Sequence, residues 1–210
     1  MRCWAGRGSS PRGSEVLVIA SGNPGKVHEF SHLLTGLGLE IRPQPKGLEV
    51  EETGSTFAEN ARLKATAVAR ATGAWALADD SGLAVEALGG APGVHSARYA
   101  DTDVARIARL LKELATAQAA DPAASRAARF TAALAVADPS GTIRLEVEGI
   151  CPGTILKAPR GSGGFGYDPV FLVDEAGRTF AEMAKAEKAR LGHRGRAFAL
   201  LEPQLRALLG

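Results

Sequence analysis

Cysteine is nearly absent from this chain: its 210 residues contain only two, Cys3 and Cys151. Two distant cysteines neither form a disulfide framework nor match the paired spacing of a zinc finger. No uninterrupted apolar run approaches the roughly 18 residues that a membrane span requires. The net charge of +2 gives no general attraction to nucleic acid or to an anionic membrane surface. These absences predict a cytoplasmic protein that binds neither nucleic acid nor a membrane.

The remaining composition is that of a globular protein, with 45% hydrophobic and 23% charged residues. The chain is long enough to build one sizeable core. Residues 1–14, "MRCWAGRGSSPRGS", are rich in Gly, Arg and Ser and lack the apolar segment of a secretory signal. We expect a disordered leader over 1–14 and a single domain over 15–210.

Hydrophobic periodicity and turn residues predict alternating strands and helices. Helices are expected from Pro24 to the glycines at 36 and 38, over 57–72, around 107–114 and over the C-terminal leucines. The alanine-rich stretch 115–125 is predicted to be a surface connection. Strands are expected over 15–20, 39–43, 74–78, 83–88, 129–138, 142–150 and 168–173.

Two local patterns give the strongest support for these predicted elements. Thr56 and Glu59 have the spacing of a capping box, which marks the start of the helix over 57–72. The stretches 129–138 and 142–150 form a hairpin around "DPSG", and the second alternates apolar with charged residues, as a strand with one wet face does. Helices mixed with at least one antiparallel pair predict an α/β fold with a mixed sheet flanked by helices.

The stretch "SGNPGKVHEFSH" over 21–32 contains two conflicting signals. Its second half matches H-E-x-x-H, the helical pattern of zinc proteases. On a helical wheel, however, His28 and His32 fall almost opposite the apolar stripe, and no third histidine follows at short spacing. Glu51 or Glu52 would have to act as a distant ligand. An exposed polar face is therefore the favoured interpretation, with a zinc protease as a weak alternative.

The first half of this stretch predicts an anion site. A strand followed by Gly22, Pro24 and Gly25 and then by a helix presents backbone N–H groups at the positive end of a helix dipole. Lys26 adds a full positive charge. The pattern is not a Walker loop, so its meaning depends on the residues that accompany it.

Three further clusters accompany it. Acidic residues gather over 49–53, and Asp79 and Asp80 stand at the end of an apolar strand. Because adjacent side chains on a strand point to opposite faces, only one of these two aspartates is expected to join a cleft. A glycine-rich stretch with two aromatics spans 161–169, and Lys188, His193 and Arg194 come soon after. Carboxylates for Mg²⁺, rings that stack on a base and cations that neutralise polyphosphate together suggest a nucleotide site.

In this order the motifs resemble the inosine triphosphate pyrophosphatase family. The similarity covers about Val16 to the C-terminus and rests on "SGNPGK", "EETGSTFAENARLKA", "ADDSGLAVEALGGAPGVHSARYA", "GSGGFGYDP" and "EK…HRG". It implies an elongated, two-lobed mixed sheet with the active-site groove between the lobes. It also implies a Mg²⁺-dependent homodimer that hydrolyses the α–β phosphoanhydride of dITP, ITP and XTP or dXTP, giving monophosphate and pyrophosphate, and so removes non-standard purines from the nucleotide pool.

The resemblance also assigns roles to residues of this chain. Asp80 would be the catalytic base and, with Glu51, would hold the metal. Asn60 and Lys64, at i and i+4 on one helix face, would support the phosphates. The implied substrate-binding residues are Ser21, Gly22, Asn23, Pro24, Gly25 and Lys26 for the triphosphate, Ser81 beside the base catalyst, Phe165, Gly166, Tyr167 and Asp168 around the purine, and Lys188, His193 and Arg194 at its edge.

Base selectivity would follow from hydrogen-bond polarity. A donor from Arg194 or His193 pairs with the O6 acceptor of hypoxanthine or xanthine and opposes the amino group of adenine. The sequence does not indicate how guanine is rejected. Two positions depart from the family pattern: Gly192 stands where Ser is usual before the His-Arg pair, and Ser21 stands where Thr is also common.

Two other functions compete with this one. A phosphate-binding module without catalysis would keep Lys26 and the glycine loops but would not need both Glu51 and Asp80. A related pyrophosphatase with a preference for pyrimidine or modified nucleotides would use the same groove.

Overall fold

The computed structural model describes residues 15–209, and the leader expected over 1–14 lies outside that range. One mixed seven-stranded sheet has the order β2-β1-β3-β4-β5-β6-β7. Its strands are β1 (Val16–Ile19), β2 (Glu40–Pro43), β3 (Trp75–Val85), β4 (Ala127–Ala137), β5 (Ile143–Ile155), β6 (Phe171–Val173) and β7 (Arg178–Thr179). The helices are α1 (Pro24–Leu33), α2 (Phe57–Thr72), α3 (Asp103–Ala120), α4 (Lys185–Leu191) and α5 (His193–Leu209), with 3₁₀ turns at Glu86–Leu88, Gly93–Arg98 and Phe180–Glu182.

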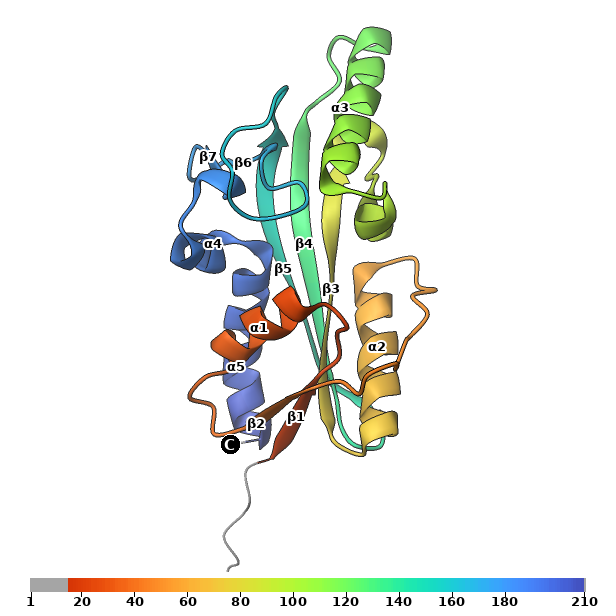
Figure 1. Ribbon diagram of the computed structural model, residues 1–210, viewed down its shortest axis with the longest axis vertical. Coiled ribbons are helices and arrows are strands. Elements are labelled where there is room, and N and C mark those ends of the chain that lie inside the picture. Colours follow the sequence, from red (N-terminus) through yellow and green to blue (C-terminus); the bar gives the residue numbers. More distant parts are fainter. Residues whose placement is uncertain (1–14, 210) are drawn as a thin grey trace, which may run out of the picture.

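The molecule is elongated because three long antiparallel strands run along most of its length (Figure 1). β3 and β4 have 11 residues each and β5 has 13. At one end the parallel strands β1 and β2 extend the sheet and α1, α2 and α5 cover it. At the other end lie α3, α4, β6 and β7 (Figure 1). The expected α/β fold with two lobes on a mixed sheet is confirmed.

The two lobes have separate apolar cores. In the first lobe, Phe30 of α1 and Leu201 of α5 pack on one face of the sheet, while the small side chains of α2 pack on the other. Phe130, Phe171 and Phe180 belong to the core of the second lobe. Between these cores, β3 carries Asp79, Asp80, Ser81 and Gly82 across the waist of the molecule. The polar residues of the sequence motif thus lie between the two apolar cores.

The topology itself creates a crevice at this point. β1 pairs with β2 on one side and with β3 on the other, both in parallel. The connections through α1 and α2 lie on opposite faces of the sheet. The carboxyl ends of β1 and β3 therefore form a topological switch point, the usual place for ligands in open α/β sheets. β1 ends at Ile19, so one edge of β3 beyond Leu77 is left without a neighbouring strand.

Local sequence signals account well for the helices. Thr56 accepts a hydrogen bond from the Glu59 backbone, the Glu59 side chain accepts one from the Thr56 backbone, and α2 runs over Phe57–Thr72 as expected. Gly73 ends this helix in the left-handed conformation, with φ of 63°.

Some expected boundaries are wrong. The strands expected over 74–78 and 83–88 are one strand, because "DDSG" stays extended and keeps its pairing with β4. The surface connection expected over 115–125 is helical as far as Ala120, because its alanines favour helix and Gln118 remains part of α3. The strand expected over 168–173 begins only at Phe171, after a turn in which the Val170 and Phe171 amides donate to the Tyr167 carbonyl.

Within the part of the chain that the structure describes, no helix combines the length and apolarity needed to cross a membrane.

Candidate active site

The site is organised by β3, on which consecutive residues face opposite sides of the sheet. The Asp79 side chain faces α1 and α5, whereas that of Asp80 faces α2. Both carboxylates are buried, with 3% and 7% of the residue exposed. The sequence predicted that only one of the two joins a cleft. In the structure each holds a lysine on its own side of the strand.

On the first side, the chain leaves β1 through the expected anion loop. Asn23 caps α1, and its side-chain oxygen accepts from the Gly25 and Lys26 amides at 2.9 and 3.4 Å. These two N–H groups are therefore satisfied locally and are not free to bind an anion. The positive charge comes from Lys26, whose Nζ lies 2.7 Å from Asp79 Oδ2.

On the second side, Asp80 contacts both residues that the sequence placed on one face of α2. Lys64 Nζ lies 2.8 Å from its Oδ1, and Asn60 donates to its Oδ2 at 3.2 Å. The same Lys64 Nζ lies 2.9 Å from Glu52. Arg98, on the turn Gly93–Arg98, lies 3.2 Å from the other oxygen of Glu52.

The acidic residue beside Asp80 is thus Glu52, whereas the sequence assigned Glu51. Glu51 is exposed, and among the described residues it has no recorded polar side-chain contact. The Gly54 amide donates to Asn60 at 2.8 Å and holds this turn against α2. The sequence could not tell which of the two adjacent glutamates points toward Asp80. The segment 44–56 is irregular, and the hydrogen bond from Gly54 to Asn60 decides which of its side chains face α2. Arg98 was not predicted at all.

Burial and charge act against each other in this cluster. Burial raises the pKa of Asp80 above its ordinary value even though Lys64 opposes this shift. Burial also acts to raise the pKa of Glu52, but the hydrogen bond and charge of Lys64, with Arg98, hold it below its ordinary value. The Lys64 pKa is raised, because its two carboxylate partners outweigh the cost of burial. The cluster therefore keeps the Lys64 ammonium charged at neutral pH.

The cluster also has the donor set of a site for a hard divalent cation. Oxygens of Glu52 and Asp80 converge on one ammonium group, and hard carboxylate oxygens are the ligands that Mg²⁺ prefers. Mg²⁺ binds through one or two carboxylates plus substrate phosphate and water, so two are sufficient. Among the described residues there is no group of three or more His, Cys, Asp or Glu side chains arranged to hold a metal.

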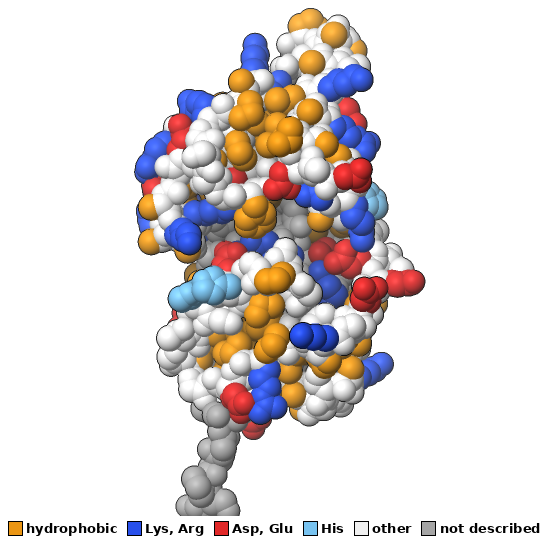
Figure 2. Space-filling model, in the orientation of Figure 1, with side chains coloured by type: hydrophobic (Ala, Val, Ile, Leu, Met, Phe, Trp, Pro, Cys, Tyr) orange, Lys and Arg blue, Asp and Glu red, His pale blue; other side chains and the backbone are white. Residues whose placement is uncertain are grey.

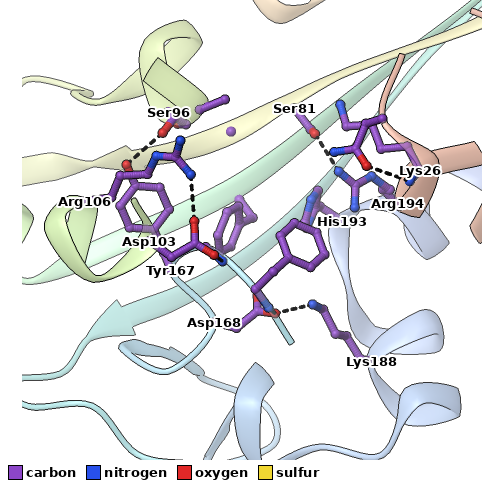
Figure 3. A pocket seen from close by; sticks show the side chains of 16 residues that line it. Lys26, Ser81, Ser96, Asp103, Arg106, Tyr167, Asp168, Lys188, His193 and Arg194 are labelled. Atoms are coloured by element: carbon purple, nitrogen blue, oxygen red, sulfur yellow. Dashed lines mark hydrogen bonds and ion pairs between the residues drawn. The ribbon is translucent and has the colours of Figure 1, made fainter. Parts of the chain in front are cut away.

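A pocket of about 180 Å³ opens on the Asp79 side of β3, at the hollowed waist between the lobes (Figures 2 and 3). Phe165 lines it with 56% of the residue exposed, and Lys188 Nζ lies 4.7 Å from the centre of its ring. Asp168 accepts from the Phe165 amide at 2.9 Å and from Lys188, so one carboxylate fixes both groups. An exposed aromatic ring backed by a cation is suited to stacking on a base.

The far wall of the pocket is formed by the start of α5. His193 stacks on Phe130 with ring centres 4.8 Å apart and an interplanar angle of 12°. Burial lowers the pKa of His193 well below its ordinary value, and the neighbouring Arg194 lowers it further, so the imidazole is neutral. Arg194 donates to Asp79 at 3.3 Å, to Glu29 at 3.1 Å and to Ser81 at 3.0 Å.

The opposite wall was not predicted from the sequence. Asp103, at the start of α3, accepts from the Gly166 amide at 2.7 Å and pairs with Arg106 at 2.6 Å. The Tyr167 hydroxyl donates to the Ser96 carbonyl at 2.9 Å, so Tyr167 braces the loop from a buried position (Figure 3). These contacts tie the aromatic loop to α3 and to the "HSARY" turn, which explains why those segments carry a recognisable motif.

Not all predicted residues meet in this pocket. Asn23, Lys26, Ser81, Lys188, His193, Arg194 and the loop from Phe165 to Asp168 line it. Ser21, Gly22 and Pro24 instead line a wider neighbouring groove, with His28 and the segment from Pro43 to Glu49. Asp80, Asn60 and Lys64 lie on the α2 side of β3.

The zinc-protease alternative gains no support. His28 and His32 lie on the exposed face of α1, as the helical wheel predicted, with ring centres 4.5 Å apart. Their neighbours on this face provide no third ligand among the described residues.

Comparison with known proteins identifies the family of this chain. The model of the Ham1 family matches residues 17–204. A dITP/XTP pyrophosphatase of Parasynechococcus marenigrum is 62% identical over 194 residues, which is 92% of this chain and 96% of the relative. One from Nostoc is 53% identical over 196 residues, covering 93% and 97%.

Solved structures give the same result. A HAM1 protein from Coxiella burnetii superposes with a TM-score of 0.84 at 42% identity, covering 91% of this chain and 98% of the other. A nucleoside-triphosphatase / dITP/XTP pyrophosphatase from Mycobacterium abscessus superposes with a TM-score of 0.71 at 41% identity, covering 90% and 99%. Sequence and fold therefore agree that this chain belongs to the Ham1 family.

Proposed function

We propose that this protein is a nucleoside triphosphate pyrophosphatase that hydrolyses dITP, ITP and XTP or dXTP to the monophosphate and pyrophosphate. One observation carries the proposal: around residues 79–82 of β3, a pocket with an exposed aromatic ring, a buried arginine and two half-buried lysines adjoins a carboxylate cluster. A purine in the Phe165 pocket would direct its phosphates toward Lys26 and the free edge of β3. The relatives named dITP/XTP pyrophosphatase support the same chemistry.

Asp80 is the proposed general base. It is a buried carboxylate whose pKa is raised by burial, which makes it a better proton acceptor than an exposed aspartate. Lys64 and Asn60 fix both of its oxygens, so the group is held in one orientation toward an attacking water. Lys26 and Lys64 are the cations available to stabilise negative charge that develops on the phosphates.

We propose Glu52 and Asp80 as the residues that hold Mg²⁺, with Glu51, the residue assigned from the sequence, as the alternative to be tested. When bound, the ion would supply Lewis-acid stabilisation of phosphate charge. Lys64 bridges the same two carboxylates, so it would balance their charge in the free protein.

Selectivity for O6 purines is proposed to come from the start of α5. Arg194 is buried, with its guanidinium held by Asp79, Glu29 and Ser81, so it is a rigid donor at the pocket wall. Such a donor pairs with O6 and is left unpaired opposite the amino group of adenine, which costs binding free energy. Unpaired polar groups of this kind discriminate between substrates by up to about 10⁴.

A turnover panel tests the proposal. Purified protein with Mg²⁺ is given dITP, XTP, dGTP, dATP and dTTP, and pyrophosphate and orthophosphate are measured separately. We expect pyrophosphate as the product, with dITP and XTP favoured. Orthophosphate release, or dATP turned over as fast as dITP, would overturn the proposal, and a preference for dTTP would support the pyrimidine alternative instead.

Assembly and location are further parts of the proposal. The family resemblance supports a homodimer, and the near absence of cysteine supports a reducing cytoplasm. Light scattering coupled to gel filtration would give the mass of the assembly in solution; a monomer over the working concentration range would contradict the dimer.

A further inference from the structure

A single buried carboxylate links the two halves of the proposed nucleotide site. Asp79 Oδ2 lies 2.7 Å from Lys26 Nζ and 3.3 Å from Arg194 Nε, and Ser81 donates to it at 3.3 Å. Lys26 lies in the first turn of α1 on the proposed phosphate side, whereas Arg194 lies in the first turn of α5 on the proposed base side. Two helices from distant parts of the chain therefore meet on one oxygen of β3. Figure 3 labels the two cations, Lys26 and Arg194, near each other at the right.

The buried position of the Asp79 carboxylate strengthens its interactions with both cations. Its side chain is only 1% exposed, so it interacts with both cations with little screening by water. Lys26 and Arg194 both lie within 3.3 Å of the same oxygen, so two cations share one buried carboxylate. Its other oxygen, Oδ1, is buried and has no hydrogen-bond partner. That oxygen is a spare acceptor, available when one of the two cations moves.

We propose that Asp79 is a positioning residue that couples phosphate recognition by Lys26 to base recognition by Arg194. The inference rests on the proposed function and goes beyond it, because it predicts that one residue sets affinity at both ends of the substrate. When a triphosphate engages Lys26, Asp79 keeps Arg194 in place. Without the carboxylate, two cations within 3.3 Å of one point would repel each other, and both would leave their positions.

Glu29 provides a matched control. It lies 3.1 Å from Arg194 but forms no recorded ion pair with Lys26 among the described residues, and its side chain is 34% exposed. Removing its charge should therefore disturb the base side only. Asp79→Asn and Glu29→Gln are both close to isosteric, so the comparison isolates the carboxylate that is shared.

The test uses two readouts that do not depend on the fraction of folded protein. One is the ratio of kcat/KM for dITP to that for dATP, and the other is the inhibition constant of inorganic tripolyphosphate. For Asp79→Asn we expect the ratio to fall about tenfold or more and the inhibition constant to rise about tenfold. For Glu29→Gln we expect a lower ratio with an unchanged inhibition constant. A merely structural role would lower the amount of active enzyme and move neither readout.

If Asp79→Asn fails to fold, Lys26→Met tests the same coupling. Lys26 is on the phosphate side, yet its removal should change the dITP to dATP ratio at least threefold, because Asp79 then holds Arg194 alone. An unchanged ratio in Lys26→Met, or an Asp79→Asn variant altered at one end only, overturns the inference. Wild-type turnover is measured first: if the wild type does not hydrolyse dITP, the proposed function fails, whereas normal wild-type turnover with unmoved readouts removes only the role of Asp79.

Discussion

Asp79 and Asp80 are chemically identical neighbours, and the alternation of a strand gives them different surroundings. Asp80, with Lys64 and Asn60 as partners, is the residue assigned as the base. Replacement by Asn keeps the shape and removes the ability to accept a proton. We expect Asp80→Asn to lower kcat by about 10²–10⁴, the usual contribution of a general base. Steady-state pyrophosphate release measures the effect, and near-normal turnover would refute the assignment.

The same variant should remain folded. The raised pKa of Asp80 means that the folded protein favours the protonated carboxyl group. The stability that protonation adds is therefore present at low pH and is lost as pH rises through the pKa of the folded state. The ionised group therefore costs stability at neutral pH, and the uncharged Asn avoids this cost. Thermal unfolding near pH 7 should give a Tm no lower than that of the wild type, and a large drop would show instead that the ion pair with Lys64 dominates.

The adjacent glutamates allow a second test at the scale of one residue. Glu52 contacts Lys64, whereas Glu51 is exposed. We expect Glu52→Gln to shift the Mg²⁺ concentration for half-maximal turnover upward by tenfold or more, because a carboxylate ligand is lost. Glu51→Gln is the matched control and should leave the Mg²⁺ titration unchanged. The reverse result would restore the metal assignment made from the sequence.

At the scale of elements, the position of α5 depends on one glycine of β5. A Cβ atom on Gly149 would lie 2.2 Å from the Ala197 amide nitrogen and 2.2 Å from the His193 carbonyl oxygen, which are backbone atoms of α5. We expect Gly149→Ala to destabilise the protein by about 1–3 kcal/mol, as overpacking does. It should also raise KM for dITP, because the displaced helix carries His193 and Arg194.

Gly177 offers the control for this variant. It lies in the turn before β7 with φ of 63°, and a Cβ there would meet nothing within 4 Å. Gly177→Ala should cost about 1–2 kcal/mol through backbone strain alone and leave KM unchanged. Denaturant unfolding and steady-state kinetics on both variants separate packing from strain; an unchanged KM in Gly149→Ala would show that α5 adjusts without moving the pocket wall.

The elements themselves were largely predictable from local sequence. The Thr56 to Glu59 capping box, Gly73 and the alternation in β5 are short-range signals, and each gave a correct element. The error at "DDSG" has a physical cause: Asp and Gly favour turns in isolation, but continuous pairing with β4 keeps Asp79 to Gly82 extended. Long-range pairing decides such a segment, and no local pattern reports it.

The site was predictable only where a motif named its residues. Lys26, Asp80 and Phe165 belong to recognisable stretches, so the sequence could propose them for the site. The positions of Glu52 and Asp103 and the pairing of Asp79 with Arg194 depend on which side of a turn, helix or strand faces a partner more than ten residues away. Tertiary contacts of this kind are set by packing of the whole chain.

At the scale of the whole molecule, the long strands join the two lobes mechanically. β3, β4 and β5 pass through both cores, so neither lobe has a sheet of its own. We therefore expect both lobes to unfold in one cooperative transition, although separate cores usually permit separate unfolding. In a variant in which Trp4 is replaced by Phe, the fluorescence of Trp75 at the start of β3 reports on the first lobe. Amide hydrogen exchange at Phe130 and Cys151 reports on the second lobe. Coincident urea midpoints are the expected result, and earlier exchange of the second lobe would contradict this coupling.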